Sequence, residues 1–193
     1  MGNFSDDLQT LLSGKKRITL QMLVDSFAEK SFALFFLLLM AISALPLPTG
    51  GITQIFELIV MLLALELIAG RQAVWLPHRW LNKPIPKSLQ TTALPKFMKT
   101  IRRVEKHSRP RFSKLQNHHL TKRFIGVIVF IFTLFSFIAP PFSGLDTLPA
   151  MGVLFLSLAL IFEDGALTVI GTVIGTTGIL LVLLLGRAAI SFI

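Results

Sequence analysis

The sequence predicts an all-α integral membrane protein. It is expected to hold two repeated helical hairpins with Pro/Gly breaks, which either span the membrane or are re-entrant, a C-terminal transmembrane helix and amphipathic interfacial helices. Only 15% of the 193 residues are charged and 53% are apolar, whereas a soluble domain carries about 25% charged residues. The windows 32–45, 58–65, 124–145 and 167–186 contain no Asp, Glu, Lys or Arg, as expected of helices in lipid. The alternation typical of barrel strands is missing.

Residues 1–30 are polar to amphipathic and lack the order of a cleaved signal peptide. Thr19 can cap a helix, and an apolar face follows it at helical spacing. The members of that face are Leu20, Leu23, Val24 and Phe27. We expect a short helix lying in the membrane interface, followed by apolar helices over 31–45, 52–70, 124–139, 148–162 and 166–186.

The chain carries an internal repeat with an offset of about 94 residues. Repeat one covers about 19–70 and repeat two about 124–165, within a single membrane domain over 1–193. The corresponding positions are Pro46 and Pro140, Thr49 and Ser143, Gly50 and Gly144, and Gly70 and Gly165. Pro48 and Pro141 also lie in the breaks. Such breaks make ordinary hairpin turns, and in duplicated transporters they mark the functional centre; the sequence leaves both uses open.

Helix length leaves two hairpin geometries open. The segment 31–45 rises about 22 Å, whereas the hydrocarbon core is about 30 Å thick. Either the first helix of each hairpin extends backward, so that Lys30 in the first hairpin, and Lys122 and Arg123 in the second, snorkel to the interface, or each hairpin enters the membrane and returns without crossing it. In the second geometry, protein or water must cover the exposed backbone.

Charge predicts the orientation. The connector 71–123 carries 14 Lys and Arg residues and one acid, Glu105, while the turns 46–51 and 140–146 carry no Lys or Arg. The positive-inside rule places the connector and the N-terminus in the cytoplasm. Both hairpins then start from that side, as parallel repeats of a multi-pass protein.

Ionisable residues within an apolar helix are functional candidates. Glu57 and Glu66 are both in segment 52–70, where Glu66 is close enough to its end to snorkel and Glu57 is deep only if the hairpin is re-entrant. Asp164 and Gly165 are expected to form a turn with Gly past the fourth helix, as are Gly70 and Arg71 past the second.

The fifth apolar helix carries Gly171, Gly175 and Gly178. Small residues at this spacing allow close backbone approach, either within the chain or in a homodimer.

The connector is suited to lipid contact. Trp75 and Trp80 lie among basic residues as membrane-interface anchors, and the basic amphipathic segment 96–112 is suited to anionic lipid rather than nucleic acid. There is no cysteine and no metal-ligand spacing. Catalytic constellations and phosphate-cradling loops are also missing. We therefore expect no metal, no cofactor and no enzymatic activity.

Five stretches, in order, carry a family resemblance. They are "ITLQMLVDSFAEKSFALFFLLLMAISALPLP", "GRQAVWLP", "RVEKHSRPR", "PPFSGLDTLP" and "FEDG". With them the chain resembles the ExoD family of exopolysaccharide-synthesis proteins. The resemblance implies a bacterial inner-membrane protein with no established catalytic residues. The family-like positions are Pro46, Pro48, Gly70, Arg71, Trp75, Pro77, Arg109, Pro110, Arg111, Asp164 and Gly165.

Two functions are compatible with these features. One is assistance in exopolysaccharide synthesis or export, with the broken hairpins forming a path for a small solute or a lipid-linked precursor and the basic face attracting its anionic groups. The other is a non-transporting scaffold or structural dimer that recruits partners through the connector. The first requires a polar site between the hairpins.

Overall fold

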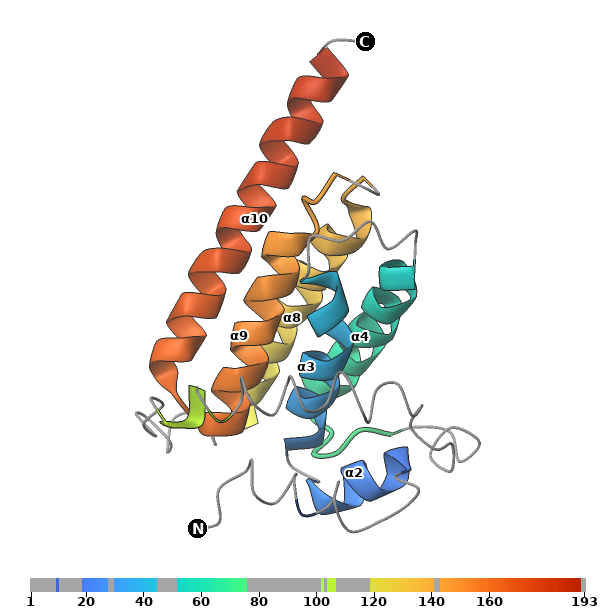
Figure 1. The fold of residues 1–193 in the computed structure, drawn as a ribbon, viewed down its shortest axis with the longest axis vertical. Helices are drawn as coiled ribbons and strands as arrows, with labels where there is room; N and C mark the ends of the chain where they lie inside the picture. The colour runs from blue at the N-terminus through green and yellow to red at the C-terminus, as the bar shows by residue number, and fades with distance from the viewer. Residues whose placement is uncertain are drawn as a thin grey trace.

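The computed structural model describes residues 10, 19–27, 30–44, 52–75, 102, 104–106, 119–140 and 143–191. The elements of this part of the chain are helices (Figure 1). They are α2 (Leu20–Ser26), α3 (Ser31–Ser43), α4 (Ile52–Ile68), α8 (His119–Ile138), α9 (Thr147–Phe162) and α10 (Gly165–Ser191).

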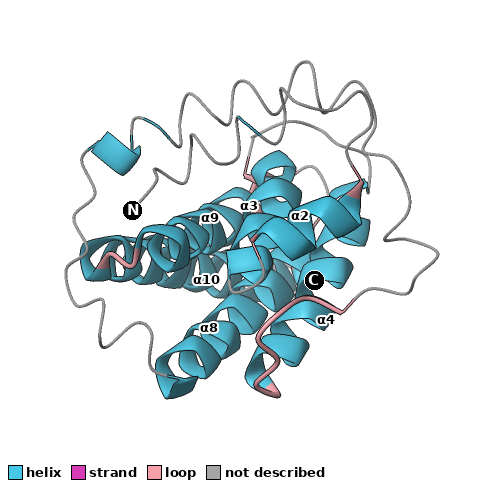
Figure 2. Cartoon of the chain, turned by 90° about the horizontal axis from the view of Figure 1, so that it is seen from below, coloured by secondary structure: helices cyan, strands magenta, loops and turns pink. Residues whose placement is uncertain are grey.

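Helices α3 and α4 form one antiparallel pair, and α8 and α9 form a second. The two pairs pack against each other, α3 against α9 and α4 against α8. Helix α10 lies outside them, against α9 and, over a smaller area, against α8 (Figures 1 and 2). Both pairs start at the lower end of Figure 1 and turn at the upper end. We call these the basic end and the turn end of the bundle. The core between the pairs is apolar and includes Phe36, Met40, Val60, Val129 and Leu156.

Most predicted helix boundaries agree with the structure within two residues, but two do not. Helix α8 begins at His119 rather than at residue 124, and α10 continues to Ser191 rather than to residue 186. The predictions ended these two helices at the limits of the uncharged runs. Leu120, Lys122 and Arg123 before residue 124, and Arg187, Ala188 and Ala189 after residue 186, favour helix, so both helices continue beyond the uncharged runs.

Gly70 ends α4 as predicted. Its φ is +91°, its N–H donates to the carbonyl O of Leu67, and Arg71 N donates to the carbonyl O of Glu66. This is the Schellman arrangement, in which a left-handed residue satisfies the last carbonyls of a helix.

Gly165 lies past α9 as expected, but it is not the left-handed residue that ends this helix. The left-handed residue after α9 is Glu163, with φ +54°, and Asp164 N donates to the carbonyl O of Ala159. Gly165 instead begins α10, and Ala166 N donates to Asp164 Oδ1. Asp164 therefore occupies the capping position, because its side chain accepts a hydrogen bond from an otherwise unsatisfied N–H of the first turn.

At the N-terminal side, α2 follows Thr19, whose Oγ1 accepts a hydrogen bond of 3.4 Å from Met22 N. This is the cap that the sequence predicted. Of the basic segment 96–112, only Arg102 and residues 104–106 are described, and they are helical. Its proposed place on a lipid surface stays a prediction.

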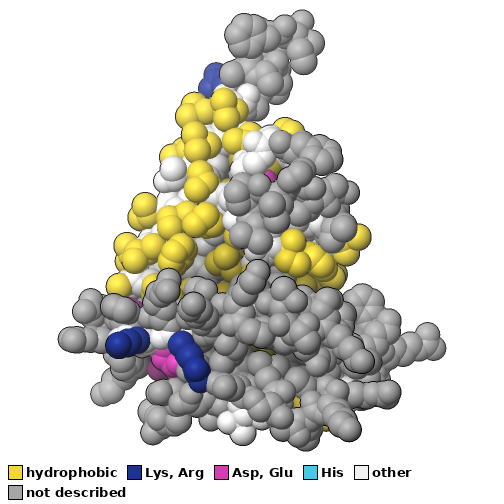
Figure 3. All heavy atoms as spheres, in the orientation of Figure 1, with side chains coloured by type: hydrophobic (Ala, Val, Ile, Leu, Met, Phe, Trp, Pro, Cys, Tyr) yellow, Lys and Arg dark blue, Asp and Glu magenta, His cyan; other side chains and the backbone are white. Residues whose placement is uncertain are grey.

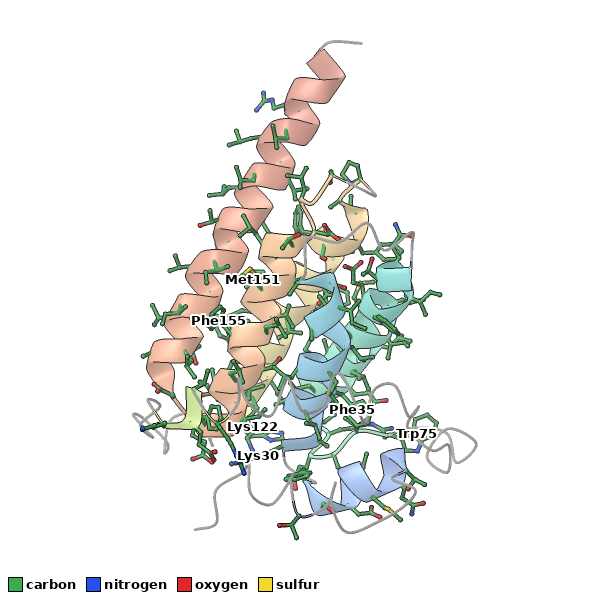
Figure 4. All side chains as sticks on the ribbon, in the orientation of Figure 1. Lys30, Phe35, Trp75, Lys122, Met151 and Phe155 are labelled. Atoms are coloured by element: carbon green, nitrogen blue, oxygen red, sulfur yellow. The ribbon has the colours of Figure 1, made fainter. Side chains whose placement is uncertain are left out.

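The glycines of α10 pack within the chain. A Cβ on Gly152 of α9 would lie 2.6 Å from the Cα of Gly175, and a Cβ on Gly171 would lie 3.0 Å from the carbonyl O of Gly152. The position of a Gly175 Cβ is occupied by the ring of Phe132. Of the two uses left open by the sequence, close packing inside the chain is the one observed. Met151 and Phe155 of α9 are labelled beside this contact in Figure 4.

Two of the described helices, α8 and α10, are long and apolar enough to cross a membrane. Large apolar side chains are exposed along α4, α8 and α10. They include Leu58, Leu62, Phe124, Ile131, Val173 and Leu184. Figure 3 shows hydrophobic side chains over α10 and the upper part of the visible face, with most of its described charged groups at the basic end.

Candidate functional site

A buried acid lies between the two hairpins near the turn end. Glu57, in the second turn of α4, is only 1% exposed. Its Oε1 accepts a hydrogen bond of 2.6 Å from Ser136 Oγ, in the last turn of α8. An acid is rarely enclosed in this way unless it is paired or has a function.

Ser136 connects Glu57 to the turn of the second hairpin. Its Oγ lies 2.6 Å from Glu57 Oε1 and 3.2 Å from the carbonyl O of Asp146. A hydroxyl carries one proton and two acceptor lone pairs. When Glu57 is ionised, Ser136 donates to it; when Glu57 is protonated, Glu57 can donate to Ser136, which then donates to Asp146. The arrangement suits a group that gains and loses a proton without losing its hydrogen bonds.

Further polar groups gather around this pair. Ser43 Oγ, at the end of α3, lies close enough to interact with the Glu57 carboxylate but makes no hydrogen bond of good geometry to it. It and Thr147 Oγ1, the first residue of α9, are buried without hydrogen-bond partners in the described part of the chain. Asp146 lies close enough to interact with Glu57 electrostatically, and partial burial raises the pKa of its carboxyl above the usual value. We call Glu57, Ser136, Ser43, Asp146 and Thr147 the acid cluster.

Sequence reasoning found Glu57 but missed its partners. Ser43 and Ser136 are the polar residues that precede Pro46 and Pro140 by three and four positions in otherwise apolar runs. That recurrence was a usable signal, although a lone serine in an apolar helix commonly bonds its own backbone. Glu66 is a surface residue, whose Oε2 accepts a hydrogen bond of 3.0 Å from Trp75 N.

The other predicted residues are distributed between the two ends of the bundle. Gly70, Arg71 and Trp75 lie at the basic end, where the Arg71 guanidinium carbon is 5.5 Å from the centroid of the Trp75 ring. Gly144, with φ +69°, and Pro140 lie in the exposed turn after α8. The predicted residues outside the described part of the chain are Pro46, Pro48, Gly50, Pro77, Arg109, Arg111 and Pro141.

Two cations at the basic end connect the hairpins. Lys30 Nζ donates a hydrogen bond of 2.8 Å to the carbonyl O of Ile161 and lies 3.9 Å from Glu163 Oε1. Arg123 Nη2 donates to the carbonyl O of Ala69 at 3.5 Å. In each case a cation at the start of one hairpin satisfies a carbonyl at the end of the other, a favourable place for positive charge. Figure 4 labels Lys30, Lys122 and Trp75 at this end.

An open cavity of about 340 Å³ lies at the basic end between α4 and α8. It is lined by Phe32, Leu67, Gly70, Arg71, Gln72, His119, Lys122 and Arg123. None of these lining residues is acidic. Among the described residues, no group of three or more His, Asp or Glu side chains is arranged to hold a metal ion.

These features define a helical bundle with an apolar exterior, an acid enclosed between two hairpins and two helices of membrane-spanning length. The chain belongs to the ExoD family, described as "Exopolysaccharide synthesis, ExoD", which matches residues 4–184. The family expected from the sequence is thereby confirmed, and with it a link to exopolysaccharide synthesis.

Two relatives cover most of the chain. An uncharacterized protein of Synechocystis sp. is 30% identical over 186 residues, which are 94% of this chain and 87% of the relative. Protein ExoD of Rhizobium meliloti is 28% identical over 168 residues, which are 84% of this chain and 69% of the relative. No solved structure matches the chain.

Proposed function

We propose that this chain is a bacterial inner-membrane component of exopolysaccharide synthesis or export that moves a small solute or a lipid-linked precursor between its two hairpins. The acid cluster is the working centre of this proposal, and Glu57 is its proton- or substrate-binding group. The role needs no catalytic step in the chain itself.

The observation that carries the proposal is the inverted polarity of the bundle. Glu57 is 1% exposed, whereas Leu58 beside it is 49% exposed. Soluble proteins rarely leave large contiguous apolar surfaces uncovered, and an apolar exterior around a polar interior suits a lipid environment.

Length and charge support a membrane placement with the basic end in the cytoplasm. Helix α8 has 20 residues and rises about 30 Å, which matches the hydrocarbon thickness. Helix α3 has 13 residues and rises about 20 Å, so the first hairpin can reach the depth of the acid cluster without crossing the whole core. The connector 71–123 with its 14 cations then faces the cytoplasm.

The position of Glu57 favours the transport hypothesis over the scaffold. A scaffold can place its acid at the lipid boundary or in a seam between copies, whereas transport needs polar groups between the hairpins. Glu57 from the first hairpin and Ser136 from the second meet there, beside two buried hydroxyls that have no other partner in the described part of the chain.

The test is complementation in a bacterium whose own copy of the gene is deleted, with secreted exopolysaccharide as the readout. Glu57→Gln keeps the size of the side chain but cannot ionise, so it should reduce secretion to near the level of the deletion strain. Glu66→Gln is the matched control, since it changes an acid on the surface of the same helix. It should secrete as the wild type does.

Protein amount is measured in washed membranes for every variant. Full secretion by Glu57→Gln at a normal membrane level contradicts a working role for the acid cluster. Recovery of the wild-type chain in the soluble fraction contradicts the membrane placement.

A further inference from the structure

The two cation contacts at the basic end allow an internal comparison. At the end of α9, Glu163 is the left-handed residue, and its carboxylate lies 3.9 Å from Lys30. At the end of α4, the left-handed residue is Gly70, and Arg123 is the cation. The first site therefore contains its own counter-charge, whereas the corresponding position of the second has no side chain at all.

The missing side chain leaves room for two basic side chains to approach the end of α4. Arg123 Nη2 and His119 Nε2 both lie within 3.0 Å of the point that a Gly70 Cβ would occupy. Arg71 and Lys122 line the same cavity. The nearest described acid in sequence, Glu66, is held by Trp75 N, and no Asp or Glu is among the described residues that line the cavity.

The cations are positioned by other contacts. Arg71 stacks against Trp75, and Arg123 is tied to the carbonyl O of Ala69. Arg123 Nε is buried and has no hydrogen-bond partner in the described part of the chain. A planar guanidinium with spare donors is the group best suited to bidentate binding of phosphate.

We propose that the cavity between the end of α4 and the start of α8 binds a phosphate group, with Arg123 and Arg71 as the main donors and Gly70 as the residue whose missing side chain lets the Arg123 guanidinium approach the end of α4. The cavity is at the lower end of the size range of ligand sites, so it accepts a phosphate or diphosphate rather than a polymer. Phe32 and Leu67 give it an apolar wall, which suits a lipid-linked or sugar-linked phosphate. The inference rests on the proposed function only for the identity of the phosphate carrier.

The experiment measures binding to the purified full chain in micelles of an uncharged detergent. One arm titrates inorganic phosphate and pyrophosphate by calorimetry. The other adds a short-chain phosphatidic acid, with phosphatidylcholine of the same chain length as reference. Binding of phosphatidic acid alone assigns the site to lipid headgroups, and binding of the soluble anions assigns it to free phosphate esters; either result supports a phosphate site.

Matched variants locate the site. Arg123→Ala should weaken binding about tenfold or more, because it removes a charge-assisted bidentate donor, whereas Arg187→Ala removes an exposed cation near the far end of α10 and should leave binding unchanged. Gly70→Ala should also weaken binding. Gly144→Ala is its control, because it imposes a similar backbone strain at a place where nothing lies within 4 Å of the new Cβ, so it should leave binding unchanged.

Arg123→Ala keeps the proposal testable even where Gly70→Ala fails to fold. Wild-type affinity in Arg123→Ala, equal losses in Arg123→Ala and Arg187→Ala, or no binding in either arm would overturn the proposal. If the purified chain binds no phosphate while exopolysaccharide secretion still requires Glu57, this inference fails and the proposed function stands. If the chain binds phosphate while secretion does not require Glu57, the proposed function fails and this inference stands.

Discussion

The close contact between α9 and α10 predicts that Gly152→Ala destabilises the fold. A Cβ at this position would lie 2.6 Å from Gly175 Cα and 2.9 Å from Gly175 N. Both are backbone atoms, so neither can rotate away. Ordinary van der Waals contact begins at 3.4 Å, and the two helices must therefore separate by about 0.8 Å at this point.

A separation of that size weakens the packing between α9 and α10 and so destabilises the fold. A gap of about 0.5–1 Å forfeits a quarter to a half of the attraction of each atom pair that it opens, and overpacked cores typically lose about 1–3 kcal/mol. We expect Gly152→Ala to lower the free energy of unfolding by about 2 kcal/mol. Unfolding is followed by circular dichroism in mixed micelles as the fraction of denaturing detergent is raised.

Thr176→Leu is the control, because Thr176 is exposed on α10 next to Gly175. Its effect should stay within about 0.5 kcal/mol. The reasoning is refuted if Gly152→Ala is as stable as the wild type. It is also refuted if the variant changes the mass of the particle from two chains to one while the fold keeps its stability, since the glycines would then form a seam between copies. The homodimer itself stays a prediction.

Three smaller predictions use the polar contacts. Ser136→Ala removes the hydrogen bond to a buried carboxylate and should cost about 1.5–3 kcal/mol in the same unfolding assay, with a smaller loss when Glu57→Gln is already present; additive losses argue against coupling. Because burial raises the pKa of Asp146, its contribution to stability is present at low pH and is lost as the pH rises through the pKa of the folded state. Asp146→Asn should therefore flatten the dependence of stability on pH, and an unchanged slope contradicts the assignment. Lys30→Met removes a hydrogen bond of 2.8 Å from a charged donor to the carbonyl O of Ile161 as well as a partly exposed ion pair with Glu163, and should cost about 1.5–3 kcal/mol, most of it from the hydrogen bond; a loss below about 0.5 kcal/mol would show that this contact does not hold the hairpins together.

Helix content and helix order were predictable because both follow from hydropathy. Uncharged runs and Pro/Gly punctuation place α3, α4 and α9 within two residues. The start of α8 was not predictable in this way, since hydropathy marks the limits of an apolar run and not the end of the helical hydrogen bonds. Lys122 and Arg123 continue the helix into polar surroundings.

The acid cluster was only half predictable. Glu57 stands out because charge is rare in an apolar run, whereas its partner Ser136 is 79 residues away and is brought to it by the packing of α4 against α8. The basic cavity could not be predicted from charge alone, because the connector contains many cations. What distinguishes Arg123 is its approach to Gly70, a contact between two elements that are distant in sequence.

Polar contacts between the hairpins are concentrated at the two ends of the bundle. At the turn end Ser136 reaches Glu57, and at the basic end Lys30 and Arg123 reach terminal carbonyls of the opposite hairpin. Between these ends the interface is an apolar core, which has no directional contacts to break when helices slide. A neutral hydrogen bond contributes about 0.5–1.5 kcal/mol and one to a charged group about 1.5–3 kcal/mol, so either end can open while the other stays closed. Alternating access requires two closures that open separately on either side of a binding group. Here the acid cluster is both the binding group and the closure at the turn end, and the cation contacts form the closure at the basic end. This distribution of contacts is better suited to moving a solute than to holding a scaffold rigid.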